Sequence, residues 1–426
     1  MSFPRLVKQR KKSRVMGKVE VVRRDEYEER DLDAKVELIR ELIPLGLMHA
    51  HELLDQEVRA LAGPRRERAA DRSGNRHGSN PGSVRLGGQR VPIRVPRVRS
   101  SQGEIPLRSY GMLHDSDGEV DPVLLRRVLY GISCRNYEAA AESIPGAIGL
   151  SSSTVSRAFV SASAAQLRAF QERDLSDEDV VVLFLDGKTF AEDTMVVALG
   201  VTISGEKRFL GFVETDTETE KVLTPFLRSL VERGLDVSGG LLVVIDGGKG
   251  LRSAVNKALK GRAVVQRCQW HKRENVVSYL ARSEQATWRR RLQKAYERPT
   301  EKEARAALEA LRVELEEKNQ SAAASLAEGL EETLTLHRLN VFGLLGRSLK
   351  TTNCLESVNA LVEERCAKVD AWKNSDQKQR WLATALMEVE PRLRRIMGYR
   401  HLPKLREAIQ RELKIEVVEQ ADEKAA

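Results

Sequence analysis

The most constraining feature of this sequence occurs twice: an apolar run that ends on an aspartate, with a glycine after it. The two runs are VVVLFLDGKTF, residues 180–190, and LLVVIDGGKG, residues 241–250. Short apolar runs next to glycine are typical of strands that are buried on both faces. In open α/β sheets the reactive crevice lies at the carboxyl ends of the strands. Asp186 and Asp246 are therefore candidate site residues.

The surrounding residues predict a mixed five-stranded sheet. VVVLFLD, MVVALGVTI and KRFLGFVET have strand patterns with turn signals between them, which predicts three strands connected as hairpins. Helical patterns separate LLVVID from AVVQRC, so two more strands follow by crossovers and run parallel to the first. If the strands that carry Asp186 and Asp246 are neighbours in this sheet, the two carboxylates project side by side.

Paired carboxylates at one edge of a sheet indicate a metal site. Two carboxylates a few Å apart resist joint ionisation, and a divalent cation removes that cost. Magnesium and manganese prefer oxygen ligands, and a two-ion phosphodiester site needs a third carboxylate. Glu356, in the helical segment TTNCLESVNALVEERC, is our candidate. An apolar strand followed by Asp-Gly also occurs where the pair only caps a helix or starts a turn, but two copies in this strand order favour the metal site.

The positive charge is concentrated near the N-terminus. The chain has a net charge of +9, and residues 1–100 alone hold 23 Lys and Arg against 14 Asp and Glu. In VRLGGQRVPIRVPRVRS, valines alternate with Arg94, Arg97 and Arg99, which predicts a strand with one basic face suited to a phosphate backbone. The preceding segment DRSGNRHGSNPGS predicts a loop, and the arginines from Arg65 to Arg76 have a solvated, flexible linker as the alternative interpretation.

A second DNA-binding pattern lies between residues 121 and 170. RNYEAAAESI predicts a helix, PGAIG a turn, and LSSSTVSRAFVSASAAQL a second helix that begins with serines suited to capping. A helix, a short turn with glycine and a polar-edged helix are typical of a helix-turn-helix, although an ordinary helical hairpin has the same pattern. The residues expected to face DNA are Ser152, Ser153, Thr154, Ser156 and Arg157.

Composition limits the protein class. No apolar run approaches the ~20 residues that span a bilayer. Four cysteines in 426 residues indicate a reducing compartment rather than a disulfide scaffold. We therefore expect a cytoplasmic, nucleoid-associated protein without a membrane partner.

Four separated blocks carry a family resemblance: FLDGK, VIDGGKGL, VQRCQWHKRENV and TTNCLESVNALVEER. Together with YGISCRNYEAA and LSSSTVSR ahead of them, they closely resemble Mutator-type transposases of bacterial insertion sequences, over roughly residues 130–390. The resemblance implies a ribonuclease H-like α/β fold: a mixed five-stranded sheet with a helical insertion, preceded by a helix-turn-helix region. It also implies that Asp186, Asp246 and Glu356 form a D-D-E triad, with Cys268 and His271 as an accessory pair.

The implied activity is metal-dependent cleavage and strand transfer of the element's own ends. The expected cofactor is two Mg²⁺ or Mn²⁺ ions per site, and the expected substrates are terminal inverted repeats and target DNA. Because two ends must be paired, we expect a homodimer or a higher oligomer on DNA. Lys249, at a helix start beside Asp246, is a further candidate for phosphate contact.

Several alternatives compete with this interpretation. A transposase-derived DNA-binding protein without catalysis is the main rival, and the intact triad counts against it. A haloacid dehalogenase-like phosphatase needs an acid at position 188, where Lys188 stands. Cys268 and His271 cannot close a tetrahedral zinc site alone. Trp270, between them, is expected to belong to the core rather than to stack on a base.

We expect five regions along the chain. These are a basic N-terminal DNA-binding region (1–110), a helix-turn-helix region (111–175), the first part of the catalytic core (176–280), a helical insertion (281–345), and the completion of the core with C-terminal helices (346–426).

Overall fold

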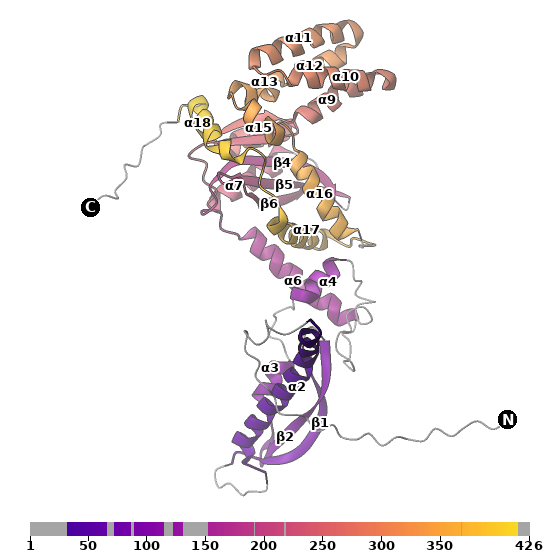
Figure 1. The fold of residues 1–426 in the computed structure, drawn as a ribbon, viewed down its shortest axis with the longest axis vertical. Coiled ribbons are helices and arrows are strands. Elements are labelled where there is room, and N and C mark those ends of the chain that lie inside the picture. The colour runs from indigo at the N-terminus through magenta and orange to yellow at the C-terminus, as the bar shows by residue number, and fades with distance from the viewer. Residues whose placement is uncertain are drawn as a thin grey trace, which may run out of the picture. The chain divides into compact units, whose positions relative to one another are not determined.

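The computed structural model describes the chain with short gaps, as residues 32–65, 72–86, 89–114, 122–130, 152–190, 192–216, 219–367 and 369–415. The chain forms two compact units (Figure 1). The first comprises residues 1–117 and 142–149, and the second comprises residues 118–141 and 150–426. None of the described helices is both long enough and apolar enough to cross a bilayer.

The first unit is a long helix packed on a β-ribbon. Its elements are α2 (Leu32–Ala62), β1 (Asn75–Leu86), β2 (Gln89–Ser100), β3 (Gly103–Ile105) and α3 (Arg108–His114). The three strands are antiparallel in the order β1-β2-β3. Leu54 and Val58 of α2 are buried with Val91, Ile93 and Val95 of β2, so the valines of the predicted basic strand face the core.

One prediction for this unit is wrong: much of DRSGNRHGSNPGS is strand, not loop. Residues 75–83 belong to β1. The register shifts between Arg76 and Ser79, and Gly78 has a φ of +75°, so a bulge accommodates the glycine. Pro81 is tolerated because β1 is an edge strand, where one row of N–H groups has no partner strand.

The second unit contains the predicted mixed sheet. Its strands are β4 (Val180–Phe190), β5 (Asp193–Thr202), β6 (Lys207–Thr215), β7 (Leu241–Ile245) and β8 (Ala263–Arg267). Their order is β6-β5-β4-β7-β8. The meander of β4, β5 and β6 is antiparallel, whereas β4–β7 and β7–β8 are parallel, as the sequence predicts.

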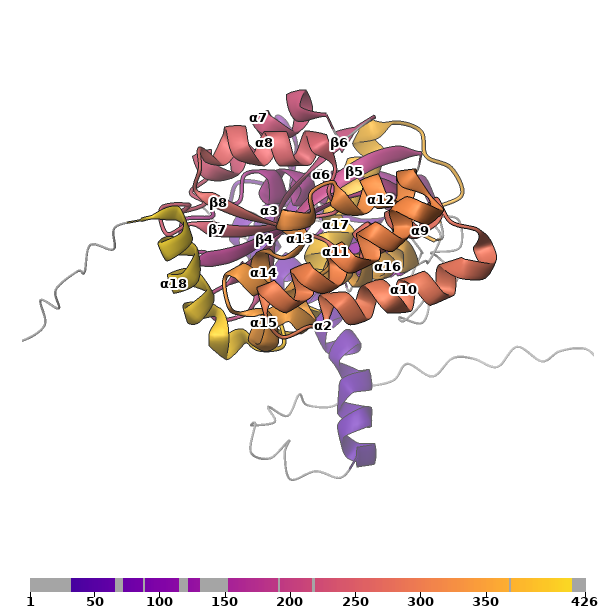
Figure 2. The ribbon, with the colours of Figure 1, turned by 90° about the horizontal axis from the view of Figure 1, so that it is seen from above.

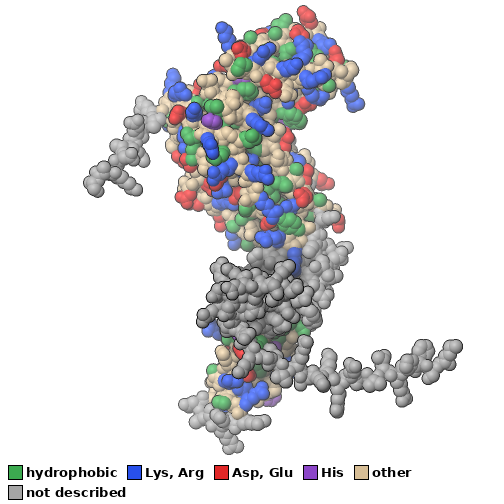
Figure 3. All heavy atoms as spheres, in the orientation of Figure 1, with side chains coloured by type: hydrophobic (Ala, Val, Ile, Leu, Met, Phe, Trp, Pro, Cys, Tyr) green, Lys and Arg blue, Asp and Glu red, His purple; other side chains and the backbone are tan. Residues whose placement is uncertain are grey.

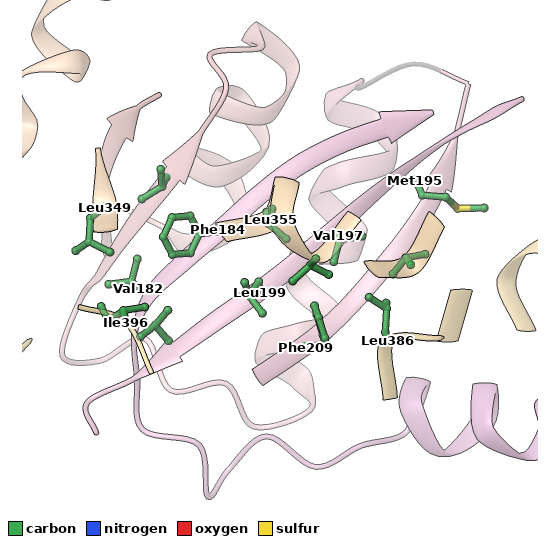
Figure 4. Close-up of a cluster of buried hydrophobic side chains, with 14 of the residues drawn as sticks. Val182, Phe184, Met195, Val197, Leu199, Phe209, Leu349, Leu355, Leu386 and Ile396 are labelled. Atoms are coloured by element: carbon green, nitrogen blue, oxygen red, sulfur yellow. The ribbon is translucent and has the colours of Figure 1, made fainter. Parts of the chain in front are cut away.

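Helices cover both faces of this sheet (Figure 2). Leu183 and Leu185 of β4 face α7 (Glu220–Glu232) and α8 (Lys249–Leu259). Val182 and Phe184 face the other layer, which includes α16 (Asn353–Cys366), α17 (Ser375–Val389) and α18 (Leu402–Leu413). In that layer Leu355 and Leu386 lie over Phe184 and Phe209 (Figure 4). Because side chains alternate along a strand, Asp186 belongs to the α16 face.

A helical insertion follows β8. It comprises α9 (Gln269–Ser278), α10 (Arg282–Tyr296), α11 (Glu301–Lys318), α12 (Gln320–Ala327), α13 (Leu330–Thr333), α14 (Thr335–Arg338) and α15 (Phe342–Leu349). Trp288, Leu292, Leu308 and Leu326 contribute to a core of its own. Charged side chains of both signs are interspersed over its visible face (Figure 3). The prediction that residues 281–345 are helical is confirmed.

The predicted helix-turn-helix is described only in its second helix. Residues 131–151, which hold the first helix and the turn, lie outside the described residues. The second helix is α6 (Ser152–Gln171), and it packs against α17, where the rings of Phe159 and Trp381 are 4.7 Å apart. The helix-turn-helix thus stays a prediction.

Candidate active site

Asp186 and Asp246 lie at matching positions on neighbouring strands. β4 and β7 are parallel, and their last paired residues are Leu185 and Ile245. Each aspartate is the next residue of the chain, so the condition under which the two carboxylates project side by side is met. Asp186 is only 8% exposed. Because burying a carboxylate costs free energy, a cation bound at this edge of the sheet would stabilise the ionised form of Asp186.

The turn that carries Asp246 is held by a buried arginine. One oxygen of Asp246 (Oδ1) accepts a 2.9 Å hydrogen bond from the Gly248 backbone N–H. Gly247 has a φ of +112°, and a Cβ added to it would lie 2.0 Å from Nε of Arg267. Arg267 is 6% exposed, and its Nη1 donates to the backbone oxygen of Glu328 at 3.1 Å. Only glycine fits between Asp246 and this guanidinium.

Cys268 and His271 flank the aspartates from the end of β8. The Cys268 N–H donates to the Ile245 oxygen at 2.7 Å, which ties the start of α9 to the residue before Asp246. Thr352 is fully buried, and its Oγ1 lies 3.5 Å from Nδ1 of His271 and 3.7 Å from Sγ of Cys268. These three residues therefore form one cluster at the carboxyl edge of the sheet.

The electrostatics of this cluster are dominated by the carboxylates and the thiol. Burial lowers the pKa of His271, but its hydrogen bond to Cys268 and the charges of Cys268, Asp186 and Asp246 outweigh burial and raise that pKa to about 9. Burial raises the pKa of the Cys268 thiol, and the bond from His271 outweighs it, so the net shift is downward. The surroundings of His271 therefore favour its protonated form.

Glu356 lies close to the pair in the fold but does not join it. It is exposed in the first turn of α16, next to buried Leu355. Leu355 packs over Phe184, two residues before Asp186 on the same face of β4 (Figure 4), so the first turn of α16 covers the Asp186 face of the sheet. Within the described ranges, however, no three His, Cys, Asp or Glu side chains are close enough to hold a metal ion.

The residues fit a divalent cation in part. Asp186 and Asp246 offer carboxylate oxygens, which magnesium and manganese prefer, and Asp186 is a buried carboxylate whose charge a cation would stabilise. The third carboxylate, that of Glu356, is on α16, which covers the Asp186 face of the sheet, and lies one helix turn after Thr352. A movement of α16 or of the Glu356 side chain is needed to bring it onto an ion held by the aspartates.

The predicted DNA-binding residues fall into two groups in the structure. Arg94 and Arg99 are exposed on β2, whereas Arg97 donates two hydrogen bonds of 2.6 Å to the Glu104 carboxylate. Thr154 is half-buried at the start of α6, and Lys249, the first residue of α8, is exposed. The other α6 candidates are also exposed: Ser152, Ser153, Ser156 and Arg157.

Sequence reasoning missed two site residues and misplaced a third. Thr352 and Arg267 stand inside quoted motifs, yet nothing in their spacing shows that they contact His271 or the Asp246 turn. Trp270 is 38% exposed, so the expectation that it belongs to the core is wrong. Its place in the first turn of α9, opposite the buried Lys272, turns the indole outward.

Comparison with known proteins agrees with the motifs. The sequence model of the Mutator family of transposases matches residues 14–395. The transposase of insertion sequence element IS256 in transposon Tn4001 from Staphylococcus aureus is 26% identical over 337 residues, which cover 76% of this chain and 83% of that protein. The transposase of IS406 from Burkholderia multivorans is 29% identical over 341 residues, which cover 76% and 84%. A family match that spans most of the sequence shows that this chain belongs to the Mutator family of transposases.

Proposed function

We propose that this protein is a D-D-E transposase that binds the terminal inverted repeats of its element and catalyses DNA strand cleavage and strand transfer. The relatives are transposases of insertion sequences, which supports this activity. The single observation that carries the catalytic part is the adjacency of Asp186 and Asp246 on paired parallel strands. A catalytically inactive descendant would have no need to retain both carboxylates there. The proposed fold class is ribonuclease H-like, on the basis of the strand order β6-β5-β4-β7-β8.

Asp186 and Asp246 would hold magnesium or manganese, and Glu356 would complete the ligand set. Two such ions supply Lewis-acid stabilisation of the attacking and leaving oxygens of a phosphodiester. Glu356 is exposed in the first turn of α16, the helix whose Leu355 packs over Phe184 of β4. Its carboxylate would reach the aspartates when substrate and metal are both bound.

The other residues of the site orient the reacting groups. Arg267 packs on Gly247 and fixes the turn, so that the Asp246 carboxylate keeps one direction. His271, held by Thr352 and Cys268, presents a cationic ring beside the carboxylates and would donate a hydrogen bond to a phosphate oxygen. Hydrolysis and strand transfer differ only in the nucleophile, water or a 3′-hydroxyl, so one site serves both.

DNA would be held outside this site by exposed basic and polar side chains. Arg94 and Arg99 on β2 suit phosphate contacts, and the exposed serines of α6 with Arg157 suit base contacts. Pairing two element ends requires at least two copies of the chain on DNA. A protein that acts on chromosomal DNA of a bacterium works in the cytoplasm, at the nucleoid.

The direct test is nicking of DNA that carries the ends of the element. Wild-type protein should nick these ends only with magnesium or manganese present. Asp186→Asn and Asp246→Asn should bind the same ends and fail to nick them, because amide oxygens do not replace the lost charge. Nicking by Asp186→Asn at the wild-type rate would remove Asp186 from the site. An absence of nicking by the wild-type protein with either metal would leave the inactive descendant as the better interpretation.

A further inference from the structure

A small basic pocket adjoins the candidate active site. It has a volume of about 150 Å³ and lies between α9, α10, α15 and the first residue of α16. Its lining includes Trp270, Arg273, Gln293, Arg347, Lys350 and Asn353. At roughly 30 Å³ per water, its volume equals that of about five waters, which suits a phosphate group or the edge of one base and excludes a duplex.

The pocket is positively charged without compensation. Arg273, Arg347 and Lys350 line it, and none of its lining residues is acidic. Arg273 donates a 2.8 Å hydrogen bond to the neutral side chain of Gln293, and Nζ of Lys350 lies 5.8 Å from the centre of the Phe342 ring. Among the described residues, none of the three cations has an ion-pair partner. A pocket with three such cations suits an anionic ligand.

The wall of the pocket also offers an aromatic surface. Trp270 is 38% exposed, although a large aromatic side chain gains most when it is buried. Its ring is packed edge-on against the His271 ring, with centroids 4.7 Å apart and planes at 73°. This packing fixes the indole while part of it stays open to a ligand. Cations beside a fixed, accessible aromatic ring are typical of sites for single-stranded nucleic acid.

The pocket shares its wall with the active-site cluster. Trp270 adjoins His271 in the chain, and the backbone N–H of Gln269 donates to the Lys350 oxygen at 2.9 Å. Asn353 begins α16, the helix that carries Glu356 in its first turn. The pocket is therefore contiguous with the cluster that contains His271, on the side of α9 and of the first turn of α16.

We propose that this pocket takes the phosphate of one unstacked nucleotide of the DNA strand next to the scissile phosphate, with the base of that nucleotide against Trp270 at the pocket wall. Arg347, Lys350 and Arg273 would hold its phosphate, and its base would stack on Trp270. Bases inside a duplex are already stacked on both faces, so the indole can receive only a base that has left the stack. The proposal rests on the proposed function, since it takes DNA as the substrate, and it adds a specific site for the strand beside the cut.

The test uses binding alone, so that it is independent of cleavage. The probe is a short fluorescent oligothymidylate with one 5-iododeoxyuridine, added to full-length Asp186→Asn protein without metal. Irradiation should cross-link the probe to Trp270, and Trp270→Ala should weaken binding by about 5- to 150-fold, the range for removal of one base–aromatic stack. Trp270→Phe should keep most of the affinity, because a smaller aromatic face remains.

Matched controls separate the pocket from general charge and aromatic effects. Tyr279→Ala removes another exposed aromatic, at the other end of α9, and should leave binding unchanged. In the double variant Arg347→Ala/Lys350→Ala, the slope of the logarithm of the binding constant against the logarithm of salt concentration should become shallower by about 0.7 for each phosphate that the variant no longer neutralises. Arg290→Ala with Lys294→Ala removes the same charge from exposed positions outside the pocket and should flatten it less.

Wild-type affinity in Trp270→Ala, or an absence of cross-linking to Trp270, would overturn the proposal. Either result leaves the roles of Asp186 and Asp246 untouched, because no cleavage is measured. Conversely, if the probe cross-links to Trp270 but the wild-type protein never nicks element ends, the proposed function is refuted and the pocket remains a binding site for single-stranded DNA.

Discussion

At the scale of single residues, the site depends on a glycine as much as on its acids. Gly247 combines a φ of +112° with close approach to the Arg267 guanidinium. Both features exclude a side chain at position 247, so the orientation of Asp246 depends on glycine as the next residue. The sequence shows this glycine, but its packing against residue 267 is set by the pairing of β7 and β8, which no local pattern gives.

Gly247→Ala should therefore be costly. The added methyl meets Arg267, and alanine is strained at this φ, so we expect a decrease of about 1–3 kcal/mol in the free energy of unfolding. Chemical denaturation measures it. Gly343→Ala is the matched control, since its Cβ would meet nothing within 4 Å and its helical position favours alanine. Equal effects of the two substitutions would contradict the packing described for Arg267.

Glu57 of α2 provides a pH-dependent interaction in the first unit. Its carboxylate accepts from the backbone N–H groups of Arg108 at 2.8 Å and Ser109 at 2.9 Å, at the start of α3. Burial raises the pKa of Glu57, but the hydrogen bonds from Ser109 and Arg108 outweigh burial and hold it below its usual value of 4.5. The stabilisation is therefore fully present above pH 4.5 and is lost as pH falls through the folded-state pKa.

Glu57→Gln should weaken this interaction at neutral pH by about 1 kcal/mol, as expected when a helix end loses a charged partner. The measurement is amide hydrogen exchange at Ser109 in the full chain, which should become faster. Glu52→Gln, at an exposed position of the same helix, is the control. Protection at Ser109 that is equal in wild type and Glu57→Gln would show that the carboxylate does not hold α3.

At the scale of elements, buried polar side chains of α9, the first helix of the insertion, hold the segment from α12 to α13. Lys272 is fully buried and donates to the backbone oxygens of Ser325 and Glu328. Burial lowers the pKa of Lys272 to about 8, and the charge of Arg267 contributes. Gln269 donates to the Thr333 oxygen at 2.9 Å. The segment from α12 to α13 is thus tied to α9, and the residue that precedes α9, Cys268, is bonded to the residue before Asp246.

Lys272→Met should loosen this segment. It removes the Lys272 donor from the Ser325 carbonyl and leaves the Glu328 carbonyl with its bond from Arg267, and an unsatisfied buried group costs about 1–3 kcal/mol. Hydrogen exchange at residues 325–336 should become at least about tenfold faster, whereas Lys294→Met, at an exposed site on α10, should have no effect there. Unchanged protection in Lys272→Met would mean that apolar packing alone holds the insertion.

On β2, Arg97 is hydrogen-bonded to Glu104, whereas Arg94 and Arg99 are exposed. Arg94→Ala and Arg99→Ala should each flatten the salt dependence of DNA binding by about 0.9 in slope if each side chain neutralises one phosphate. Arg97→Ala should change it less, because Arg97 is held by Glu104. Binding titrations at several salt concentrations measure the slopes. A larger effect for Arg97 than for Arg94 would contradict the ribbon as the DNA-binding surface.

Strands with a buried face were predictable, and the polar edge strand was not. The apolar runs of β4 and β7, and the valine alternation of β2, identify those strands directly. β1 has little apolar pattern, because Val84 is its one buried hydrophobic residue in the described part. Its partner β2 supplies the hydrogen bonds that make it a strand, and such tertiary pairing overrides the turn propensity of glycine and proline.

At the scale of the whole molecule, the topology of the second unit follows from the sequence, while the geometry of the third carboxylate does not. Strand patterns and crossovers predict that the strands of Asp186 and Asp246 run parallel, which the β4–β7 pairing confirms, and the pairing shows that they are also neighbours. Glu356 arrives after the insertion, and its distance from the aspartates depends on how α16 packs on the sheet. That packing is set by buried residues such as Leu355, and the motif that contains Leu355 does not show which strand residues it contacts.

The most direct test of the account is manganese binding by the full chain, followed by the paramagnetic resonance signal of free Mn²⁺. If the paired carboxylates hold the metal, the wild-type protein binds the ion, and Asp186→Asn and Asp246→Asn each reduce the affinity at least about tenfold. Loss of a residue that only hydrogen-bonds a metal ligand already reduces metal affinity by about that factor. Glu364→Gln, an exposed carboxylate further along α16, should bind as wild type does. Wild-type affinity in both aspartate variants would contradict the account, because the paired carboxylates would then hold no metal.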